Sequence, residues 1–263
     1  MIKLNYFDVT GFEPAIRGMR NPLESWQGSD SIFYEFTDQD GCCYCHDIFG
    51  ASVELDSTET DEWPEDDLYI GPNDLDLMLR LAKSGPEHAK YKRMIVVYVD
   101  ILAPLYWWKE FDTYKVGTVA NSCSTMHCIH KKEFTVDDFS WEHLVGQMST
   151  DSEQPVDNSR WQQVDFANGS SPLGAMIGVI RTLNKARTLY LETKDKKYWW
   201  QMIQLLPSSY NQKRTVMLNY EVLTNIYRQR KEHKLGEWRR FCGWIEDLPY
   251  SELITLEEDG EKG

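Results

Sequence analysis

The sequence predicts mixed α and β structure (α+β or α/β), with a central mixed sheet and a helical C-terminal half. Residues 95–102 form a nearly continuous apolar, β-branched run, which is typical of a strand buried on both faces. From Gly174 onward, apolar residues recur at helical spacing. A chain of 263 residues can bury the core of one large domain or two small ones. We expect a single domain, residues 1–263, with insertions at about 28–67 and 146–172.

The N-terminal part is expected to form a strand and two helices before the central strand. Residues 2–7 have the pattern of a short strand, and a helix over 13–20 should end before Pro22. Residues 74–84 have the apolar periodicity of an amphipathic helix, and Gly85 with its following proline ends that helix.

Two polar clusters in this part allow either a binding or a structural interpretation. Arg17 and Arg20 lie one helical turn apart, so they share a face that is either solvated or in contact with an anion. Cys42-x-x-Cys45 followed by His46 has metal-ligand spacing, but a structural zinc needs four ligands. We expect unrelated reduced cysteines and no metal, and a solvated loop for the acidic run that follows. The candidates for completing a zinc site would be Cys123, His127, Cys128 and His130.

The central strand leads into a helix and then a small polar loop. Ala103-Pro104 ends the strand, because proline donates no amide hydrogen and restricts the residue before it. Residues 105–115 have helical spacing, and residues 117–124 are small and polar within a bulky, aromatic chain. Small side chains let a ligand approach backbone amides, so this loop is the best candidate binding loop. The alternative is a turn softened by Gly117.

The C-terminal half is predicted to consist of four helices and a tail. The helices are expected over 176–194, 197–205, 216–230 and 235–245, with a break at Leu206-Pro207. The polar tail, residues 257–263, is expected to be disordered.

Composition limits the kinds of ligand and the compartment. The chain carries 28 basic and 42 acidic residues, a formal charge of −14, which argues against binding a nucleic acid polymer. A small anion held by a few local cations remains compatible with this charge. No apolar run approaches the roughly 20 residues of a membrane span, and no signal peptide is recognisable. We therefore expect a cytoplasmic protein, without membrane contact, whose six cysteines are reduced.

Short motifs occur in a fixed order over most of the chain outside the two insertions. They comprise a helix with Arg17 and Arg20, the strand ended by Ala103-Pro104, the loop with Ser124, Leu206-Pro207, a helix with Asn219, Leu223, Asn225 and Arg230, and Glu237-Trp238-Arg239. This ordered set resembles the flavin-dependent thymidylate synthase (ThyX) family.

The resemblance implies a ThyX-like α/β fold, a homotetramer, and FAD bound between subunits. In that family reduced flavin mediates one-carbon transfer from methylenetetrahydrofolate to dUMP, with NADPH as the reductant, so this chain would be a methyltransferase of bacterial or phage origin. The implied flavin-binding residues are His88, Asn219, Asn225 and Arg230. Ser124 would lie at the nucleotide end, with Tyr114 and His127 as acid/base or stacking groups or, alternatively, as packing residues. The substrate-binding candidates are Lys109, Lys115, Asn121 and Ser122.

Several arginines of the family pattern are replaced in this chain. Met126, Ile203 and Glu221 stand where the family has arginine, and Thr113-Tyr114-Lys115 stands for Arg-His-Arg. A bidentate guanidinium is not replaced by Met, Ile or Glu. Either the substrate is a related pyrimidine nucleotide, or the protein is a non-catalytic ThyX-like nucleotide- or protein-binding protein. Candidate substitute cations are Lys92, Arg93, Lys109 and Lys115.

Overall fold

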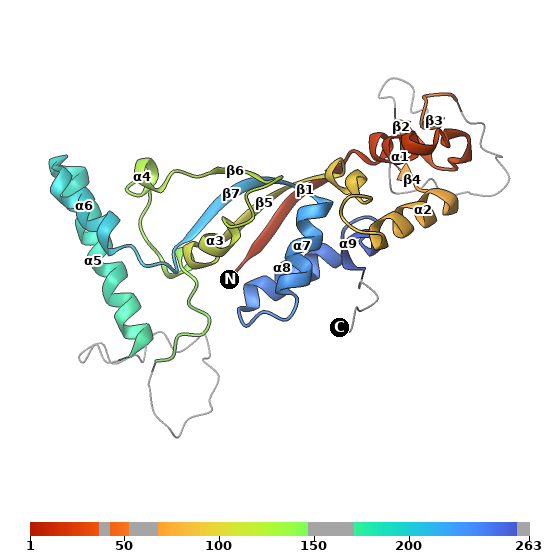
Figure 1. The fold of residues 1–263 in the computed structure, drawn as a ribbon. Coiled ribbons are helices and arrows are strands. Elements are labelled where there is room, and N and C mark those ends of the chain that lie inside the picture. Colours follow the sequence, from red (N-terminus) through yellow and green to blue (C-terminus); the bar gives the residue numbers. More distant parts are fainter. Residues whose placement is uncertain (37–42, 53–67, 147–170, 257–263) are drawn as a thin grey trace. The chain divides into compact units, whose positions relative to one another are not determined.

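The computed structural model describes residues 1–36, 43–52, 68–146 and 171–256 (Figure 1). These residues form two compact units. The first unit comprises residues 1–5, 100–113 and 120–216, and the second comprises 6–99, 114–119 and 217–263. Four predicted features lie wholly or mostly outside the described residues, namely the acidic run of the first insertion, Cys42, the second insertion at about 146–172 and the tail 257–263.

A four-stranded sheet has the order β1-β5-β7-β6. Its strands are β1 (Lys3–Thr10), β5 (Val96–Pro104), β7 (Asn211–Asn219) and β6 (Val119–Ser122), and each contributes residues to both units. β5 alternates along its length, with Val97, Val99 and Ile101 fully buried and Tyr98 on the other face 44% exposed. The prediction that this strand is buried on both faces is therefore wrong for the single chain, because only alternate residues reach the core.

Among the residues that the structure describes, the second unit contains five α-helices, three short 3-10 helices and a small sheet. Phe12 and Tyr220 are buried in this unit, and their rings meet edge to face at 5.7 Å. In the small sheet, β2 pairs antiparallel with both β3 and β4. The elements are α1 (Phe12–Arg20), η1 (Asn21–Leu23), η2 (Trp26–Gly28), β2 (Ile32–Phe36), β3 (Cys43–His46), β4 (Leu68–Tyr69), α2 (Pro72–Lys83), η3 (Lys90–Arg93), α7 (Tyr220–Arg230), α8 (Gly236–Glu246) and α9 (Glu252–Thr255).

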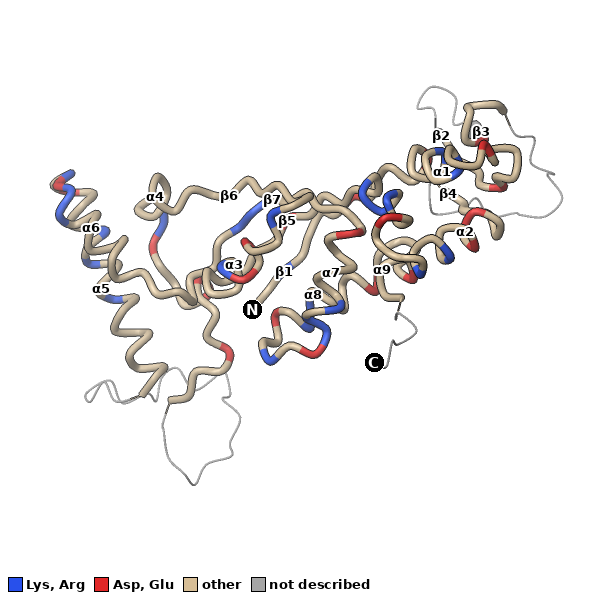
Figure 2. Tube along the Cα trace, viewed as in Figure 1, with Lys and Arg blue, Asp and Glu red and all other residues tan. Residues whose placement is uncertain are grey.

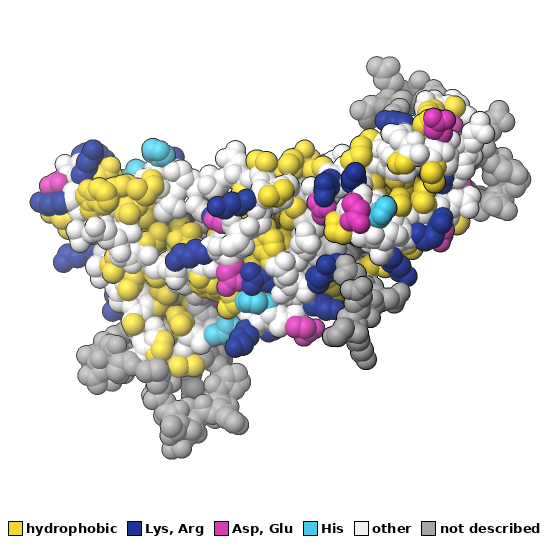
Figure 3. Space-filling model, in the orientation of Figure 1, with side chains coloured by type: hydrophobic (Ala, Val, Ile, Leu, Met, Phe, Trp, Pro, Cys, Tyr) yellow, Lys and Arg dark blue, Asp and Glu magenta, His cyan; other side chains and the backbone are white. Residues whose placement is uncertain are grey.

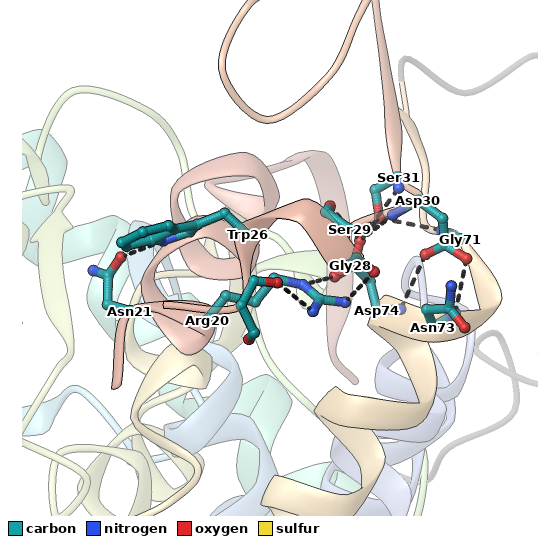
Figure 4. A network of polar contacts seen from close by, with 11 residues as sticks. Arg20, Asn21, Trp26, Gly28, Ser29, Asp30, Ser31, Gly71, Asn73 and Asp74 are labelled. Atoms are coloured by element: carbon teal, nitrogen blue, oxygen red, sulfur yellow. Dashed lines mark hydrogen bonds and ion pairs between the residues drawn. The ribbon is translucent and has the colours of Figure 1, made fainter. Parts of the chain in front are cut away.

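A buried ion pair joins α1 to α2 in the second unit (Figure 4). Arg20 donates from Nε to Asp74 Oδ1 at 2.6 Å and from Nη2 to the Gly28 carbonyl at 2.8 Å. The other Asp74 oxygen accepts the hydroxyls of Ser29 at 2.6 Å and Ser31 at 2.7 Å. The interpretation of Arg20 as a solvated or anion-contacting residue is wrong, because its guanidinium is used within the fold.

The first unit combines an aromatic helix with a helical hairpin (Figure 1). α3 (Leu105–Phe111) buries Trp107, Trp108 and Phe111. α5 and α6 pack against each other as a helical hairpin. Leu183 of α5 and Met202 of α6 form a hydrophobic core with Ile129, Phe134 and Phe139. The remaining elements are α4 (Thr125–Cys128), η4 (Val136–Asp138), α5 (Pro172–Thr193) and α6 (Lys196–Leu205).

One predicted helix begins too early in the sequence. Residues 216–219 end β7 instead of starting a helix, and α7 begins only after Asn219. Val216 and Leu218 are buried at a period of two, which a short apolar run does not distinguish from helical spacing.

The candidate loop also contains β6, and the predicted helix 105–115 ends at Phe111. The predicted helices at 13–20, 74–84, 176–194, 197–205 and 235–245 are confirmed within a few residues.

No described helix is long and apolar enough to cross a membrane. Within the described ranges, no three His, Cys, Asp or Glu side chains gather in a way that could hold a metal ion.

Candidate functional site

The predicted binding loop is attached to strand β7 in the first unit. The backbone amide of Cys123 donates to the Lys213 carbonyl at 2.9 Å. Gln212 Nε2 donates to the Cys123 carbonyl at 3.0 Å and to Thr125 Oγ1 at 3.3 Å. These bonds hold the loop next to the side chains of β7.

A second set of contacts orients Gln212. Arg214 Nε donates to Gln212 Oε1 at 3.0 Å, so the amide nitrogen of Gln212 must face the loop. Arg214 also lies 4.1 Å from the ring centroid of Trp108 and pairs with Asp112 at 2.6 Å. Trp108 Nε1 donates to the Gln212 carbonyl at 3.0 Å. The buried helix α3 thus holds β7, and β7 holds the loop through Gln212. Gln212 is therefore a positioning residue.

A pocket of about 360 Å³ opens between this loop, the segment after α4 and β7. Its size is within the range of small-molecule sites. The wall contains hydroxyl, thiol and amide groups, three lysines and the Tyr210 ring. The lining residues are Leu102, Cys123, Ser124, Thr125, Cys128, Ile129, Lys131, Lys132, Phe134, Tyr210, Asn211, Gln212 and Lys213.

The three lysines make the pocket locally cationic. Lys132 pairs with Asp138, and Lys213 pairs with Asp100 at 2.7 Å. Lys131 makes no ion pair with any residue that the structure describes. Among the described residues, three lysines and no acidic residue line the pocket, in a chain whose formal charge is −14. Figure 2 shows basic residues directly after α4 and along β7.

Two ionisable neighbours of the pocket have shifted pKa values. Hydrogen bonds from Lys213 and Thr215 lower the pKa of Asp100, so the carboxylate that orients Lys213 is ionised. Burial, followed by the nearby Asp138 carboxylate and the thiols of Cys123 and Cys128, raises the pKa of Tyr210. Tyr210 therefore keeps its phenolic hydrogen.

A separate polar and aromatic group, comprising Tyr114, Gln229, Arg230 and Trp238, lies in the second unit. Tyr114 Oη donates to Gln229 Oε1 at 3.0 Å and accepts from Arg230 Nε at 2.9 Å. The Arg230 guanidinium carbon lies 4.8 Å from the ring centroid of Trp238. A cation held between two aromatic rings can bind an anion or a planar ring system.

Asn219 has a structural role in the second unit. Its Oδ1 accepts the Val222 amide at 3.0 Å and caps α7. Its Nδ2 approaches Gly117, where an added Cβ would lie only 2.8 Å away. Gly117 has φ +78°, so both the backbone and the close approach require glycine.

No known family profile matches the sequence, and no curated protein is detectably similar to it. Solved structures are similar in fold. ThyX from Helicobacter pylori with FAD and dUMP matches 98% of this chain and 97% of its own, with a TM-score of 0.56 and 15% identity. A second H. pylori ThyX structure with FAD and dUMP covers 98% of both chains at 14% identity and the same TM-score of 0.56. The UMP/dUMP methylase PolB from Streptomyces cacaoi, bound with 5-Br UMP, covers 94% of this chain and 88% of its own, with a TM-score of 0.53 and 11% identity.

The chain has the ThyX fold. The resemblance seen in the ordered motifs is confirmed at this level, since the matched structures cover nearly the whole chain. At 11–15% identity, the likeness shows a shared fold with α-helices and antiparallel strand pairs.

The structure disperses the residues that the ThyX motifs single out. Ser124 lines the pocket and caps α4, where its Oγ accepts the His127 amide at 3.2 Å, while the His127 side chain is exposed. His88 is exposed and lies 3.9 Å from Glu87. Four substrate-binding candidates and one flavin-binding candidate are exposed and do not line the pocket, namely Lys109, Lys115, Asn121, Ser122 and Asn225.

Two of the candidate substitute cations are used elsewhere in the ThyX-like fold. Lys92 is buried and donates to Thr224 Oγ1 at 3.4 Å. Arg93 pairs at 2.7 Å with Glu221, one of the positions where the family has arginine. Both belong to the second unit, and neither lines the pocket.

Sequence reasoning missed the lysines of the pocket, together with Gln212 and Tyr210. Lys131 and Lys132 directly follow the short helix after Ser124, and this adjacency was an available signal. Lys213 and Gln212 gave no such signal, because the strand β7 that presents them was not predicted over 211–215.

Proposed function

We propose that this ThyX-like protein binds a pyrimidine nucleotide and transfers a one-carbon unit to it with FAD, methylenetetrahydrofolate and NADPH. The observation that carries the proposal is an open, cationic pocket beside Ser124 in a chain with the ThyX fold. The matched ThyX structures contain FAD and dUMP, and PolB is a UMP/dUMP methylase bound with 5-Br UMP. The substrate class follows by analogy of fold and by the size and charge of the pocket.

Ser124 is suited to hold the nucleotide. Its Oγ accepts the His127 amide, so the hydroxyl hydrogen is left to donate into the pocket. The protonated Tyr210 phenol supplies a second donor and an aromatic face for a base. His127 is exposed and is the candidate for moving a proton to or from solvent.

The residues of the second unit fit a flavin in part. Arg230 supplies a cation, and Tyr114 and Trp238 supply aromatic surface, which suit the diphosphate and the ring system of FAD. Asn219 Oδ1 accepts the Val222 amide in the helix cap, so its amide nitrogen is the part of the side chain left to bond a ligand. When bound, FAD supplies the redox chemistry, and these side chains bind and orient it.

A second candidate function is nucleotide binding without catalysis. It is favoured by Tyr114, whose hydroxyl is already bonded to Gln229 and Arg230 and is therefore not poised for proton transfer. The replacement of family arginines by Met126, Ile203 and Glu221 favours it as well.

The deciding experiment measures flavin and nucleotide binding separately. The purified protein is mixed with excess FAD, passed through gel filtration and scanned for visible absorbance, and dUMP, UMP, dCMP and CMP binding is measured by calorimetry. Retained flavin near one per chain together with nucleotide binding supports the flavin-dependent enzyme. Nucleotide binding by a colourless protein favours the non-catalytic alternative, and failure to bind any of the four nucleotides rejects both.

A further inference from the structure

The positions at which ThyX motifs place arginine cannot supply cations in this chain. Ile203 packs against the apolar core of the first unit. Met126 is 48% exposed and carries no charge. Glu221 is acidic and is paired with Arg93. A nucleoside monophosphate is a dianion near neutral pH, so its phosphate must be compensated by other cations.

We propose that Lys131, Lys132 and Lys213 hold the phosphate of the nucleotide in the pocket beside Ser124, in place of those arginines. The inference rests on the proposed function, since it names the phosphate-binding groups of that same site. All three lysines line the pocket together with Ser124 and Thr125. They come from two segments, one directly after α4 and the other on β7, so they approach the cavity from different walls.

The network below the loop holds these two walls in register. The Lys213 carbonyl accepts the Cys123 amide at 2.9 Å, so the backbone that carries Lys213 runs directly beside the binding loop. Gln212 ties the same loop to β7 through the Cys123 carbonyl and Thr125. The Cys128 carbonyl accepts the Lys131 amide at 2.9 Å, which fixes the start of the lysine-bearing turn to the end of α4.

The two lysines with carboxylate partners still serve a phosphate. An ammonium group has three N–H donors, and a carboxylate partner uses only part of them. Asp100 and Asp138 also restrict the rotamers of Lys213 and Lys132, which reduces the entropy lost on binding. Lys131, with no ion pair to any described residue, adds the uncompensated charge. Since the whole chain is strongly acidic, this local charge makes the affinity for a dianion sensitive to salt.

The first test compares nucleotides with nucleosides. Lys131→Ala should weaken dUMP or UMP binding by about tenfold, the effect of one lost hydrogen bond to a charged group, and leave deoxyuridine and uridine binding unchanged. Lys131→Arg should recover most of the loss. Lys213→Ala should act in the same direction, and Lys196→Ala, which removes an exposed charge at the start of α6, is the matched control. Thermal unfolding of each variant verifies that it is folded.

The second test uses the pocket's own thiols. Cys123 and Cys128 are free, exposed and part of the wall, whereas Cys45 and Cys242 are buried. Alkylation with iodoacetamide, followed by peptide mass spectrometry, should slow at Cys123 and Cys128 when dUMP or UMP is added. The measurement is made at a nucleotide concentration that saturates wild type. The inference is supported if the thiols are protected in wild type and lose this protection in the Lys131→Ala, Lys213→Ala double variant.

The outcomes separate the inference from the proposed function. If wild type binds a nucleotide, and both lysine variants bind it equally well with neither thiol protected, the phosphate lies elsewhere and the inference is overturned while the function stands. If nucleoside binding falls as much as nucleotide binding, the lysines do not contact the phosphate and the inference is likewise overturned. If wild type binds none of dUMP, UMP, dCMP and CMP, the function and the inference fail together.

Discussion

At the scale of single residues, Asp74 shows how a buried charge is accommodated. Burial by itself raises the pKa of Asp74, but hydrogen bonds from Ser29, Ser31 and Arg20, together with the Arg20 charge, lower it overall. The side chains of Asp74 and Arg20 are 0% and 6% exposed, so neither can turn to water if its partner is removed. The pair therefore belongs to the stability of the second unit.

Removing the Asp74 carboxylate should destabilise the protein strongly. Asp74→Ala leaves Arg20 buried without its carboxylate partner, which costs about 3–5 kcal/mol of unfolding free energy in comparable cases. Asp76→Ala, which removes an exposed carboxylate paired with Arg80 on the same helix, is the matched control and should change stability little. Urea unfolding of the two variants makes the comparison, and equal midpoints would contradict the structural role of Asp74.

The same carboxylate predicts an acid-dependent loss of stability. Because the folded-state pKa of Asp74 lies below the ordinary 3.8, its contribution is fully present above that value. The contribution is lost as the pH falls through the folded-state pKa. The stability difference between wild type and Asp74→Ala, measured by urea unfolding, should thus shrink below about pH 4. A difference that stays constant down to pH 2 would contradict the lowered pKa.

Arg230 permits a residue-scale test of the flavin proposal. Arg230→Ala removes the guanidinium held by Tyr114 and Trp238 and should reduce FAD retained after gel filtration at least about tenfold, as for a lost charge-assisted contact. Arg240→Ala, an exposed arginine on α8, is the control. Unchanged flavin content in the Arg230 variant, provided that wild type retains FAD, would refute the assignment.

At the scale of elements, the connection from β1 to α1 depends on Gly11. This residue has φ +94°, and a Cβ there would lie 2.1 Å from the Met94 carbonyl oxygen just before β5. A backbone atom cannot yield as a flexible side chain can. The turn therefore requires glycine on two independent grounds, a left-handed backbone and a close approach.

Gly11→Ala should therefore unfold more readily than a matched variant. Gly50 also has a positive φ, +77°, but among the described residues no atom beyond its chain neighbours lies within 4 Å of the place that a Cβ would take, so Gly50→Ala is expected to carry only the backbone strain. That strain costs about 1–2 kcal/mol, and the clash at Gly11 adds to it. Thermal unfolding should show the larger decrease for Gly11→Ala, and equal decreases would contradict the close approach.

At the scale of the whole molecule, apolar side chains remain exposed in the single chain. Figure 3 shows apolar surface over α5 and α6. A pocket between these two helices has Ala186, Leu189 and Leu205 in its lining. Tyr6, Leu23 and Val116 are each more than 80% exposed. Apolar surface of this kind is typical of chains that associate.

We therefore expect the homotetramer that the ThyX resemblance implies. Sedimentation equilibrium should give a mass near four times 30.8 kDa, and that mass should persist at raised salt because burial of apolar surface is not screened. A mass of one chain at micromolar concentration would reject the tetramer and any site shared between subunits.

The sequence by itself determined the types and order of most elements and the ThyX-like fold. Apolar periodicity and capping residues act over a few positions, so the strand at β5 and the helices α1, α2, α6 and α8 could be predicted from local sequence. The order of the motifs is also a property of the chain alone, and the matched structures confirm the fold that it indicated.

Only the tertiary structure decided which polar groups meet. Lys131 and Lys213 are far apart in sequence. They share a pocket because β7 pairs with β6, which places β7 next to the loop that follows β6. Arg20 faces Asp74, although its helical spacing indicated solvent or a bound anion, and Asn219 caps α7, although the family motif implied flavin binding. The physical reason is that a polar side chain's role depends on the partner that long-range packing brings within hydrogen-bond distance, and local sequence does not specify that partner.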